Sequence, residues 1–259
     1  MKVLALVGTG IKTISHLTEE AKGYICNCDK TLYLVNEPLL EAYIKRLAKT
    51  SASLEPVYFK SQSRANSYNN IAQQIHLEVE RVNSLCVVIY GHPCVFATPG
   101  LLALSKLNHI KTVVCPAVSA QDCLYADLRF DPASGGTQTF DATEYLLYDK
   151  LIDTSSHLVI YQIGMVGNLG LPTDKVNVEA INFIKNKLLH IYKKEKRAII
   201  YEAALYPSTN PKISEFDLDD LDRQPLTTLS TLYIPPDEIQ REPSSDALKL
   251  LNQVAVENI

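Results

Sequence analysis

The feature that most constrains this chain is an unbroken apolar run at residues 85–90, which stops at Gly91-His92-Pro93. A short apolar run bounded by Gly and Pro is typical of a strand that is buried on both faces, as in a parallel sheet covered by helices. A second junction of the same kind follows, where residues 112–118 lead into Ser119. Open α/β sheets bind ligands in crevices at the carboxyl ends of such strands. The two loops therefore predict one crevice that both of them line.

Strand-like and helix-like segments alternate along the first part of the chain. We expect strands at residues 2–7, 31–35, 85–90 and 112–118, and helices at residues 14–24, 38–47, 64–82 and 100–107. This alternation predicts a mostly parallel sheet with right-handed crossovers.

After Ser119 the pattern changes. We expect strands at residues 158–163, 198–201 and 229–234, separated by a long helix near residues 175–193 and by an acidic stretch at residues 215–220. The prediction is an α/β fold with two α/β lobes, residues 1–118 and 119–238, followed by a tail at residues 239–259. The tail holds a short amphipathic stretch at residues 247–256, which we interpret as a helix that docks on a partner subunit.

Composition excludes several classes of protein. The chain has 259 residues, 46% hydrophobic and 21% charged, which is typical of a globular protein. Its net charge of −4 provides no basic face of the kind that nucleic-acid binding needs. No segment approaches the roughly 18 to 20 apolar residues of a membrane span, and residues 1–8 are too short for a signal peptide. We expect a cytoplasmic protein that binds neither nucleic acid nor membranes.

The six cysteines do not form a recognisable metal motif. Cys26 and Cys28 are close in sequence, but the other four are scattered without the paired spacing of a zinc site. Because no export signal is evident, a reducing compartment is expected, where disulfides are rare. The prediction is six free thiols and no metal site.

Three short motifs allow a structural as well as a functional interpretation. Gly8-Thr9-Gly10 lacks the third glycine of a dinucleotide-binding loop, and a tight turn explains it at least as well. His92 is the only histidine in a motif-like loop, where packing is a simpler role than general base. The segment that begins at Ser119 has the form of a capping box, which predicts a helix start. The free N–H groups of such a start can also face a polar ligand.

Several segments together resemble the tetrapyrrole-methylase superfamily, whose members bind S-adenosylmethionine in a cleft between two α/β domains. In the first half these are residues 90–96, 116–120, 126–128 and 131–132, and in the second half residues 154–158, 161–164, 201–203 and 230–236. Within the superfamily the chain most resembles the borosin peptide backbone α-N-methyltransferases, over about residues 1–240.

The resemblance implies a set of residues that contact the cofactor. They are Tyr90, His92, Val95 and Phe96 in the first lobe, Ser119 and Ala120 at the junction, and Gln162, Tyr201, Ala203, Ser230 and Thr231 in the second lobe. The chain departs from the family pattern at Cys94 and Ala117, where glycine is usual, and its first loop lacks Pro-Gly. The first two changes add only small side chains, so we expect the cleft to be kept. The third predicts a substrate unlike a tetrapyrrole.

The same resemblance implies a catalytic cluster of Tyr58, Arg64 and Tyr68, whose spacing matches the borosin pattern. Arg64 and Tyr68 are four residues apart on a predicted helix and share a face, and Tyr58 ends the strand-like segment before it. Each residue alone has a structural explanation, since Tyr68 fits the apolar stripe of the helix and Arg64 can be a solvated helix start.

The chemistry of amide methylation suits this cluster. A peptide nitrogen is a poor nucleophile because its lone pair is delocalised into the carbonyl. The pKa of tyrosine is about 10, but a nearby guanidinium favours the phenolate and can stabilise negative charge on an amide oxygen. Our hypothesis is that Tyr58 or Tyr68 takes the amide proton while Arg64 stabilises the charge.

Fused borosin enzymes carry their substrate as a C-terminal extension, whereas only about two dozen residues follow Pro236 here. We therefore expect a separate, ribosomally made precursor peptide that is methylated in trans, as in split borosin systems. The family also implies a homodimer that can bind two precursor chains. Two other readings remain open: a methyltransferase of the same superfamily that acts on a tetrapyrrole-like small molecule or on ribosomal RNA, and a non-catalytic protein that binds S-adenosylmethionine.

Overall fold

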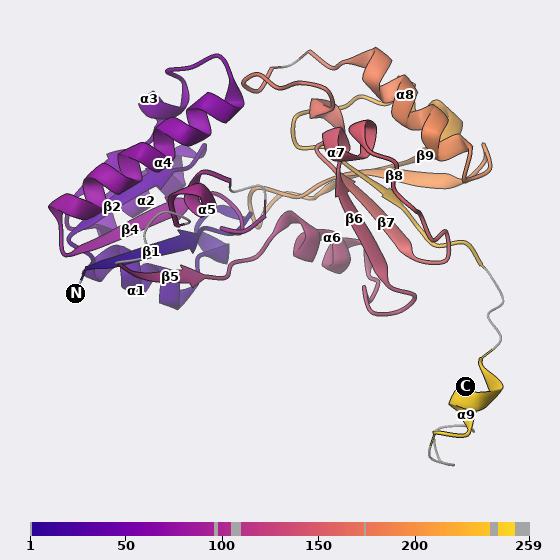
Figure 1. The fold of residues 1–259 in the computed structure, drawn as a ribbon, viewed down its shortest axis with the longest axis horizontal. Coiled ribbons are helices and arrows are strands. Elements are labelled where there is room, and N and C mark those ends of the chain that lie inside the picture. The colour runs from indigo at the N-terminus through magenta and orange to yellow at the C-terminus, as the bar shows by residue number, and fades with distance from the viewer. Residues whose placement is uncertain (1, 96–97, 105–109, 174, 239–242, 252–259) are drawn as a thin grey trace.

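The computed structural model describes residues 2–95, 98–104, 110–173, 175–238 and 243–251. They form two lobes, each built on a five-stranded sheet, which lie side by side (Figure 1). The fold class predicted from the sequence, two α/β lobes, is confirmed.

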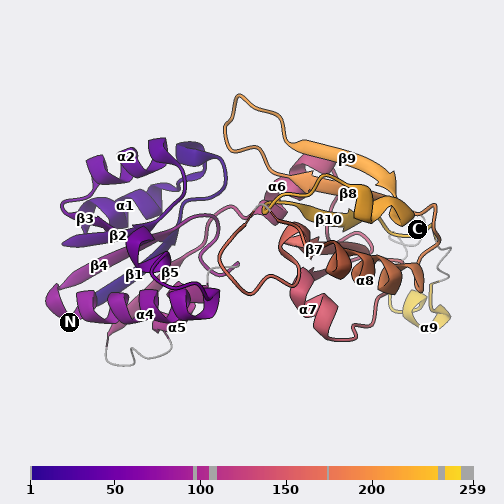
Figure 2. The same ribbon diagram turned by 90° about the horizontal axis from the view of Figure 1, so that it is seen from above.

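The first lobe contains a fully parallel sheet with the strand order β3-β2-β4-β1-β5. Its strands are β1 (Val3–Gly8), β2 (Lys30–Leu34), β3 (Ser51–Ser53), β4 (Ser84–Ile89) and β5 (Lys111–Cys115). Its helices are the 3-10 turn η1 (Thr13–His16), α1 (Glu19–Asn27), α2 (Pro38–Leu47), α3 (Glu55–Tyr58), α4 (Arg64–Arg81) and α5 (Thr98–Leu104). α1 and α2 cover one face of the sheet, and α4 and α5 cover the other (Figure 2).

The two helical layers explain why the central strands read as continuous apolar runs. Successive side chains of a strand point to opposite faces, so that Leu4 and Leu6 of β1 pack on the α4 side while Ala5 and Val7 pack on the α1 and α2 side. The same alternation holds along β4. A strand that is buried on both faces has no position left for a polar residue.

Three details of the first lobe differ from the prediction. The segment before α4 is not strand-like, because Tyr58 ends the short helix α3, which has Pro56 in its first turn. The first helix begins at Glu19 instead of residue 14, since the Thr18 side chain caps it by accepting from the Ala21 N–H at 3.1 Å. The strand expected at residues 112–118 ends at Cys115, just before Pro116.

The second lobe contains a mixed sheet with the strand order β6-β7-β10-β8-β9, in which only the β6–β7 pair is parallel. Its strands are β6 (Thr137–Asp141), β7 (His157–Tyr161), β8 (Arg197–Glu202), β9 (Lys212–Asp217) and β10 (Thr231–Ile234). Its helices are α6 (Ala120–Leu128), α7 (Ala142–Leu147), α8 (Val178–Leu189) and the 3-10 turns η2 (Ile163–Met165) and η3 (Leu218–Arg223). α7 and α8 cover one face, and α6 packs on the other (Figure 1).

The sequence did not predict β6 or α7, and the acidic stretch at residues 215–220 belongs to β9 and η3. The predicted lobe boundary at residues 118 and 119 falls in the segment between β5 and α6, and it stays a prediction. In the tail the structure describes α9 (Ser245–Leu248), and most of the predicted stretch at residues 247–256 lies outside the described residues.

Two loops of the second lobe reach the first lobe. The loop between β7 and α8 contacts the start of α4, where Ser63 and Gly170 form an antiparallel bridge (Figure 1). The loop between β8 and β9 extends toward α2, where the Tyr206 hydroxyl donates to Glu37 at 3.2 Å (Figure 2). Ile11, from the loop after β1, packs into the apolar cluster around α6. The lobes therefore meet at the carboxyl edge of the first sheet.

Within the described parts of the chain, no helix is both long enough and apolar enough to cross a membrane. In the same residues, no group of three or more His, Cys, Asp and Glu side chains is arranged to hold a metal ion. The six cysteines are free.

Candidate functional site

The loops that follow β1, β4 and β5 pack closely against one another. Gly10 and Gly91 exchange two backbone hydrogen bonds of 3.1 and 3.2 Å, and both adopt positive φ angles, +71° and +77°. A Cβ atom on Gly8 would lie 2.3 Å from the Gly91 carbonyl oxygen and 2.7 Å from the Ala117 Cβ. The contacts support the tight-turn interpretation of Gly8-Thr9-Gly10, because a side chain at Gly8 would collide with the loop that carries Gly91.

A cavity of about 230 Å³ lies where these loops face the second lobe, and we call it the cofactor cavity because several residues that the resemblance implies for the cofactor line it. It is lined by Ile11, Tyr90, Gly91, His92, Val95, Ser119, Ala120, Tyr161, Gln162, Thr228, Leu229 and Thr231. The predicted cofactor residues that line it are Tyr90, His92, Val95, Ser119, Ala120, Gln162 and Thr231. Among these predicted residues, Tyr90 and Thr231 are 141 positions apart in sequence, yet they line the same cavity.

Three predicted cofactor residues stand behind this wall. Tyr201 is 1% exposed, and its hydroxyl donates to the Asp127 carboxylate at 2.7 Å. Ser230 is fully buried, and Ala203 packs in the apolar cluster that contains Tyr201. These residues support the cavity without being among its described lining residues. Phe96, also predicted, lies outside the described residues.

The predicted capping box at the start of α6 is confirmed. The Ser119 Oγ accepts from the Asp122 N–H at 3.2 Å, and Asp122 Oδ2 accepts from the Ser119 N–H at 2.6 Å. Ser119 Oγ also donates to Asp122 Oδ2 at 2.7 Å. The cap fixes the first turn of α6 at the cavity, since Ser119 and Ala120 both line it.

His92 and Gln162 shape the backbone of the cavity wall. The His92 Nδ1 accepts from the Cys94 N–H at 3.0 Å, which braces its own loop and agrees with a packing role. Gln162 has φ +53° and ψ +38°, a left-handed conformation that is uncommon for a residue other than glycine. Such residues concentrate at ligand sites, where the surrounding structure holds them in place.

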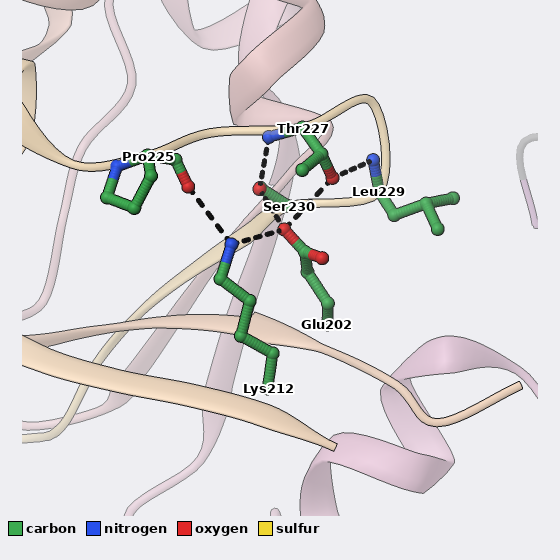
Figure 3. A network of polar contacts seen from close by, with 6 residues as sticks. All are labelled: Glu202, Lys212, Pro225, Thr227, Leu229 and Ser230. Atoms are coloured by element: carbon green, nitrogen blue, oxygen red, sulfur yellow. Dashed lines mark hydrogen bonds and ion pairs between the residues drawn. The ribbon is translucent and has the colours of Figure 1, made fainter. Parts of the chain in front are cut away.

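A partly buried carboxylate, to which no sequence motif points, holds the loop that forms the remaining wall. Glu202, at the end of β8, accepts from Ser230 Oγ at 2.6 Å, Thr227 Oγ1 at 2.9 Å and Lys212 Nζ at 3.1 Å (Figure 3). Burial raises the pKa of Glu202, but these three donors outweigh burial and leave it below its usual value. The network folds the loop that carries Thr228 and Leu229 into the cavity wall. A glutamate at the end of a strand is too common a pattern to have indicated this role.

A second cavity of about 410 Å³, here the tyrosine cavity, adjoins the first. It is lined by Leu34, Val35, Asn36, Glu55, Tyr58, Phe59, Tyr68, Ile89, Tyr90 and Pro172. Tyr90 lines both cavities. The rings of Tyr58 and Tyr68 lie 6.3 Å apart, and Ser67 holds α3 on α4 by donating to the Tyr58 carbonyl at 2.5 Å.

Arg64 lies at the start of α4, half-buried, and its Nη2 donates to the Asn168 carbonyl oxygen at 2.7 Å. Burial raises the pKa of Tyr58 and of Tyr68, and this outweighs the opposite pull of the Arg64 charge on both. Asp141, from the second lobe, raises the pKa of Tyr68 further. The Arg64 guanidinium lowers the two tyrosine pKa values, as predicted, but burial raises them by more. Both phenols are therefore protonated at neutral pH.

Two α/β lobes with a cavity at their junction define a class of ligand-binding folds, and comparison with known proteins specifies the family. The profile of the tetrapyrrole (corrin/porphyrin) methylases matches residues 3–218. The chain therefore belongs to this family. A solved structure of uroporphyrin-III-C-methyltransferase from Thermus thermophilus has the same fold, with a TM-score of 0.63, 18% identity, and coverage of 90% of this chain and 92% of that one.

Curated relatives from fungi are closer in sequence. One is the methyltransferase/ribosomally synthesized cyclic peptide gymnopeptides precursor of Gymnopus fusipes, 30% identical over 99% of this chain and 62% of that protein. Another is the methyltransferase/ribosomally synthesized type I borosin cyclic peptide precursor of Coprinopsis marcescibilis, 32% identical over 90% of this chain. The chain spans 62% of the length of each. The resemblance to the borosin proteins is thereby confirmed.

Proposed function

We propose that this chain is an S-adenosylmethionine-dependent α-N-methyltransferase that methylates backbone amides of a separate, ribosomally made precursor peptide. The observation that carries the proposal is that Tyr90 lines both the cofactor cavity and the tyrosine cavity. A methyl donor in the first cavity and a peptide in the second would meet at this ring.

The composition of the cofactor cavity supports binding of S-adenosylmethionine. Its walls combine apolar groups such as Val95 and Leu229 with polar groups and with the first turn of α6. The two adjoining cavities, which would share the cofactor and the acceptor amide, together fall within the roughly 300 to 1,000 Å³ of most small-molecule sites. The residues that would hold the cofactor are Tyr90, His92, Val95, Ser119, Ala120, Gln162 and Thr231. When bound, the cofactor supplies an electrophilic methyl group on a positively charged sulfur.

The tyrosine cavity would hold the acceptor amide. Once deprotonated, Tyr58 or Tyr68 could accept the amide proton, either from the nitrogen or from the oxygen of the imidic acid tautomer. Both are candidates, because both line this cavity with their rings 6.3 Å apart. Their raised pKa values mean that each phenol begins protonated and must lose its proton before it can act as a base. A positive charge beside them favours that loss, and Arg64 supplies one from this chain.

We also propose, from the borosin resemblance, that the enzyme works in the cytoplasm as a homodimer that can bind two precursor chains. The two fungal relatives are named as a methyltransferase joined to a cyclic-peptide precursor, which supports a peptide as the substrate class.

The test supplies the peptide as a separate molecule. The part of the Coprinopsis marcescibilis relative that this chain does not match is incubated with the protein and S-adenosylmethionine. We expect stepwise mass gains of one methyl group, and fragmentation should assign them to backbone nitrogens. Methylation of uroporphyrinogen instead of the peptide would favour the small-molecule alternative. Binding of S-adenosylmethionine without transfer to either would favour the non-catalytic alternative.

A further inference from the structure

One turn of the second lobe is hydrogen-bonded to the start of α4 through its backbone carbonyl groups. Besides the bond from the Arg64 guanidinium to the Asn168 carbonyl, the Arg64 N–H donates to the Leu169 carbonyl at 3.2 Å. The neighbouring residues Ser63 and Gly170 form the antiparallel bridge described above. Arg64 is therefore held by residues of the other lobe, about a hundred positions further along the chain.

The Asn168 side chain gives this turn its shape. Its Oδ1 accepts from the Gly170 N–H at 2.8 Å, and its Nδ2 donates to the Leu171 carbonyl at 3.2 Å. Asparagine commonly folds turns in this way, by bonding the backbone two residues ahead. The next residue, Pro172, lines the tyrosine cavity. The same turn thus supports both Arg64 and a wall of the cavity that contains Tyr58 and Tyr68.

We propose that Asn168 is a positioning residue, which sets the place of the Arg64 guanidinium relative to the two tyrosines. This inference rests on the proposed function. A guanidinium has five N–H donors, and the bond to Asn168 uses one of them. The partner is a neutral carbonyl, so the bond fixes the side chain without cancelling its charge, as a carboxylate would. The charge then remains available to stabilise negative charge on an acceptor amide.

The first test needs no substrate. The pKa values of Tyr58 and Tyr68 are measured by NMR in protein labelled with ¹³C at tyrosine Cζ, with Tyr→Phe variants to assign the two signals. Because the Arg64 charge lowers both values, Arg64→Gln should raise them. If Asn168 positions that charge, Asn168→Ala should raise them too, and the double variant should show no more than the Arg64→Gln shift.

Leu169→Ala is the matched control, since this side chain is 71% exposed and the residue contacts Arg64 through its backbone carbonyl. It should leave both tyrosine pKa values unchanged. Unchanged values in Asn168→Ala, or additive shifts in the double variant, would overturn the proposal. This readout is independent of catalysis, so it stands even if no peptide is methylated.

The second test is kinetic. A misplacement of about 1 Å can cost about 100-fold in rate, so Asn168→Ala should lower kcat by about 10- to 100-fold. KM for S-adenosylmethionine should not change, because Asn168 is not among the described residues that line the cofactor cavity. Asn168→Ser should recover part of the rate, since a serine hydroxyl can accept from the N–H two residues ahead. A raised cofactor KM with unchanged kcat would contradict a role through Arg64. Sinefungin binding by each variant shows that the fold is retained.

Discussion

The two cavities that meet at Tyr90 are built in different ways. The cofactor cavity takes its walls from both lobes, with Tyr90 and His92 on one side and Gln162 and Thr231 on the other. The tyrosine cavity belongs almost entirely to the first lobe, and Pro172 is its one described lining residue from the second. The first cavity therefore depends on how the lobes dock, whereas both tyrosines of the second come from α3 and α4 of one lobe. A substitution in α3 or α4 can therefore alter the tyrosine cavity without changing the residues that line the cofactor cavity.

The largest effect is expected when one phenol at a time is removed from the tyrosine cavity. General-base catalysis typically contributes about 100- to 10,000-fold, so either Tyr58→Phe or Tyr68→Phe should lower the methylation rate by that factor. The other substitution should have a much smaller effect, and cofactor affinity should stay the same in both. Rates are measured by mass spectrometry of the peptide, and affinity by calorimetry. If both variants lose cofactor binding, the two cavities do not act independently.

A substitution at Arg64 also tests whether the two cavities are independent, with a smaller expected effect on the rate. Arg64→Ala should slow methylation by about 100- to 1,000-fold, the range found when one donor to a developing negative charge is removed. S-adenosylmethionine should still bind with normal affinity, because Arg64 is not among the described residues that line the cofactor cavity. A normal rate of methylation in this variant would remove Arg64 from the mechanism.

A third prediction acts on the cofactor cavity alone. Glu202→Gln removes the charge that orients the loop carrying Thr228 and Leu229, and hydrogen bonds to a charged group contribute about 1.5 to 3 kcal/mol. We expect affinity for S-adenosylmethionine to fall by about tenfold or more by calorimetry, while the pKa values of Tyr58 and Tyr68 stay the same. Glu215→Gln is the control, since Glu215 pairs with Arg197 on the exposed surface of β9. Equal losses in both variants would argue against a specific role for the network.

The smallest effect concerns pH. The folded-state pKa of Glu202 lies below the ordinary value of about 4.3, so ionised Glu202 stabilises the fold at neutral pH. This contribution begins to fall as the pH drops below about 4.3, and it is lost once the pH passes the folded-state pKa. Urea unfolding of wild type and Glu202→Gln should therefore differ in free energy at pH 7 and converge in acid. A difference that grows as the pH falls would have the wrong sign.

The elements that could be predicted are those whose burial imposes a local pattern. β1 and β4 are covered on both faces and read as apolar runs, and the helix at residues 64–82 shows its apolar stripe as α4. The capping box at Ser119 was readable because all its bonds lie within one turn. By contrast, β6 and β9 are edge strands with mostly half-exposed or exposed residues, so their sequences carry no apolar run.

The sequence by itself determined the fold class, the resemblance to borosin methyltransferases, and most of the side chains that line the cofactor cavity. Only the tertiary structure decided the surroundings of Arg64, Tyr58 and Tyr68. The contact between Arg64 and Asn168 spans the two lobes, and the net pKa shift of Tyr58 and Tyr68 is set by burial that depends on α3, α4 and the opposing loop. Local patterns in a sequence report which face of an element is buried, whereas desolvation and non-local hydrogen bonds depend on what packs against it.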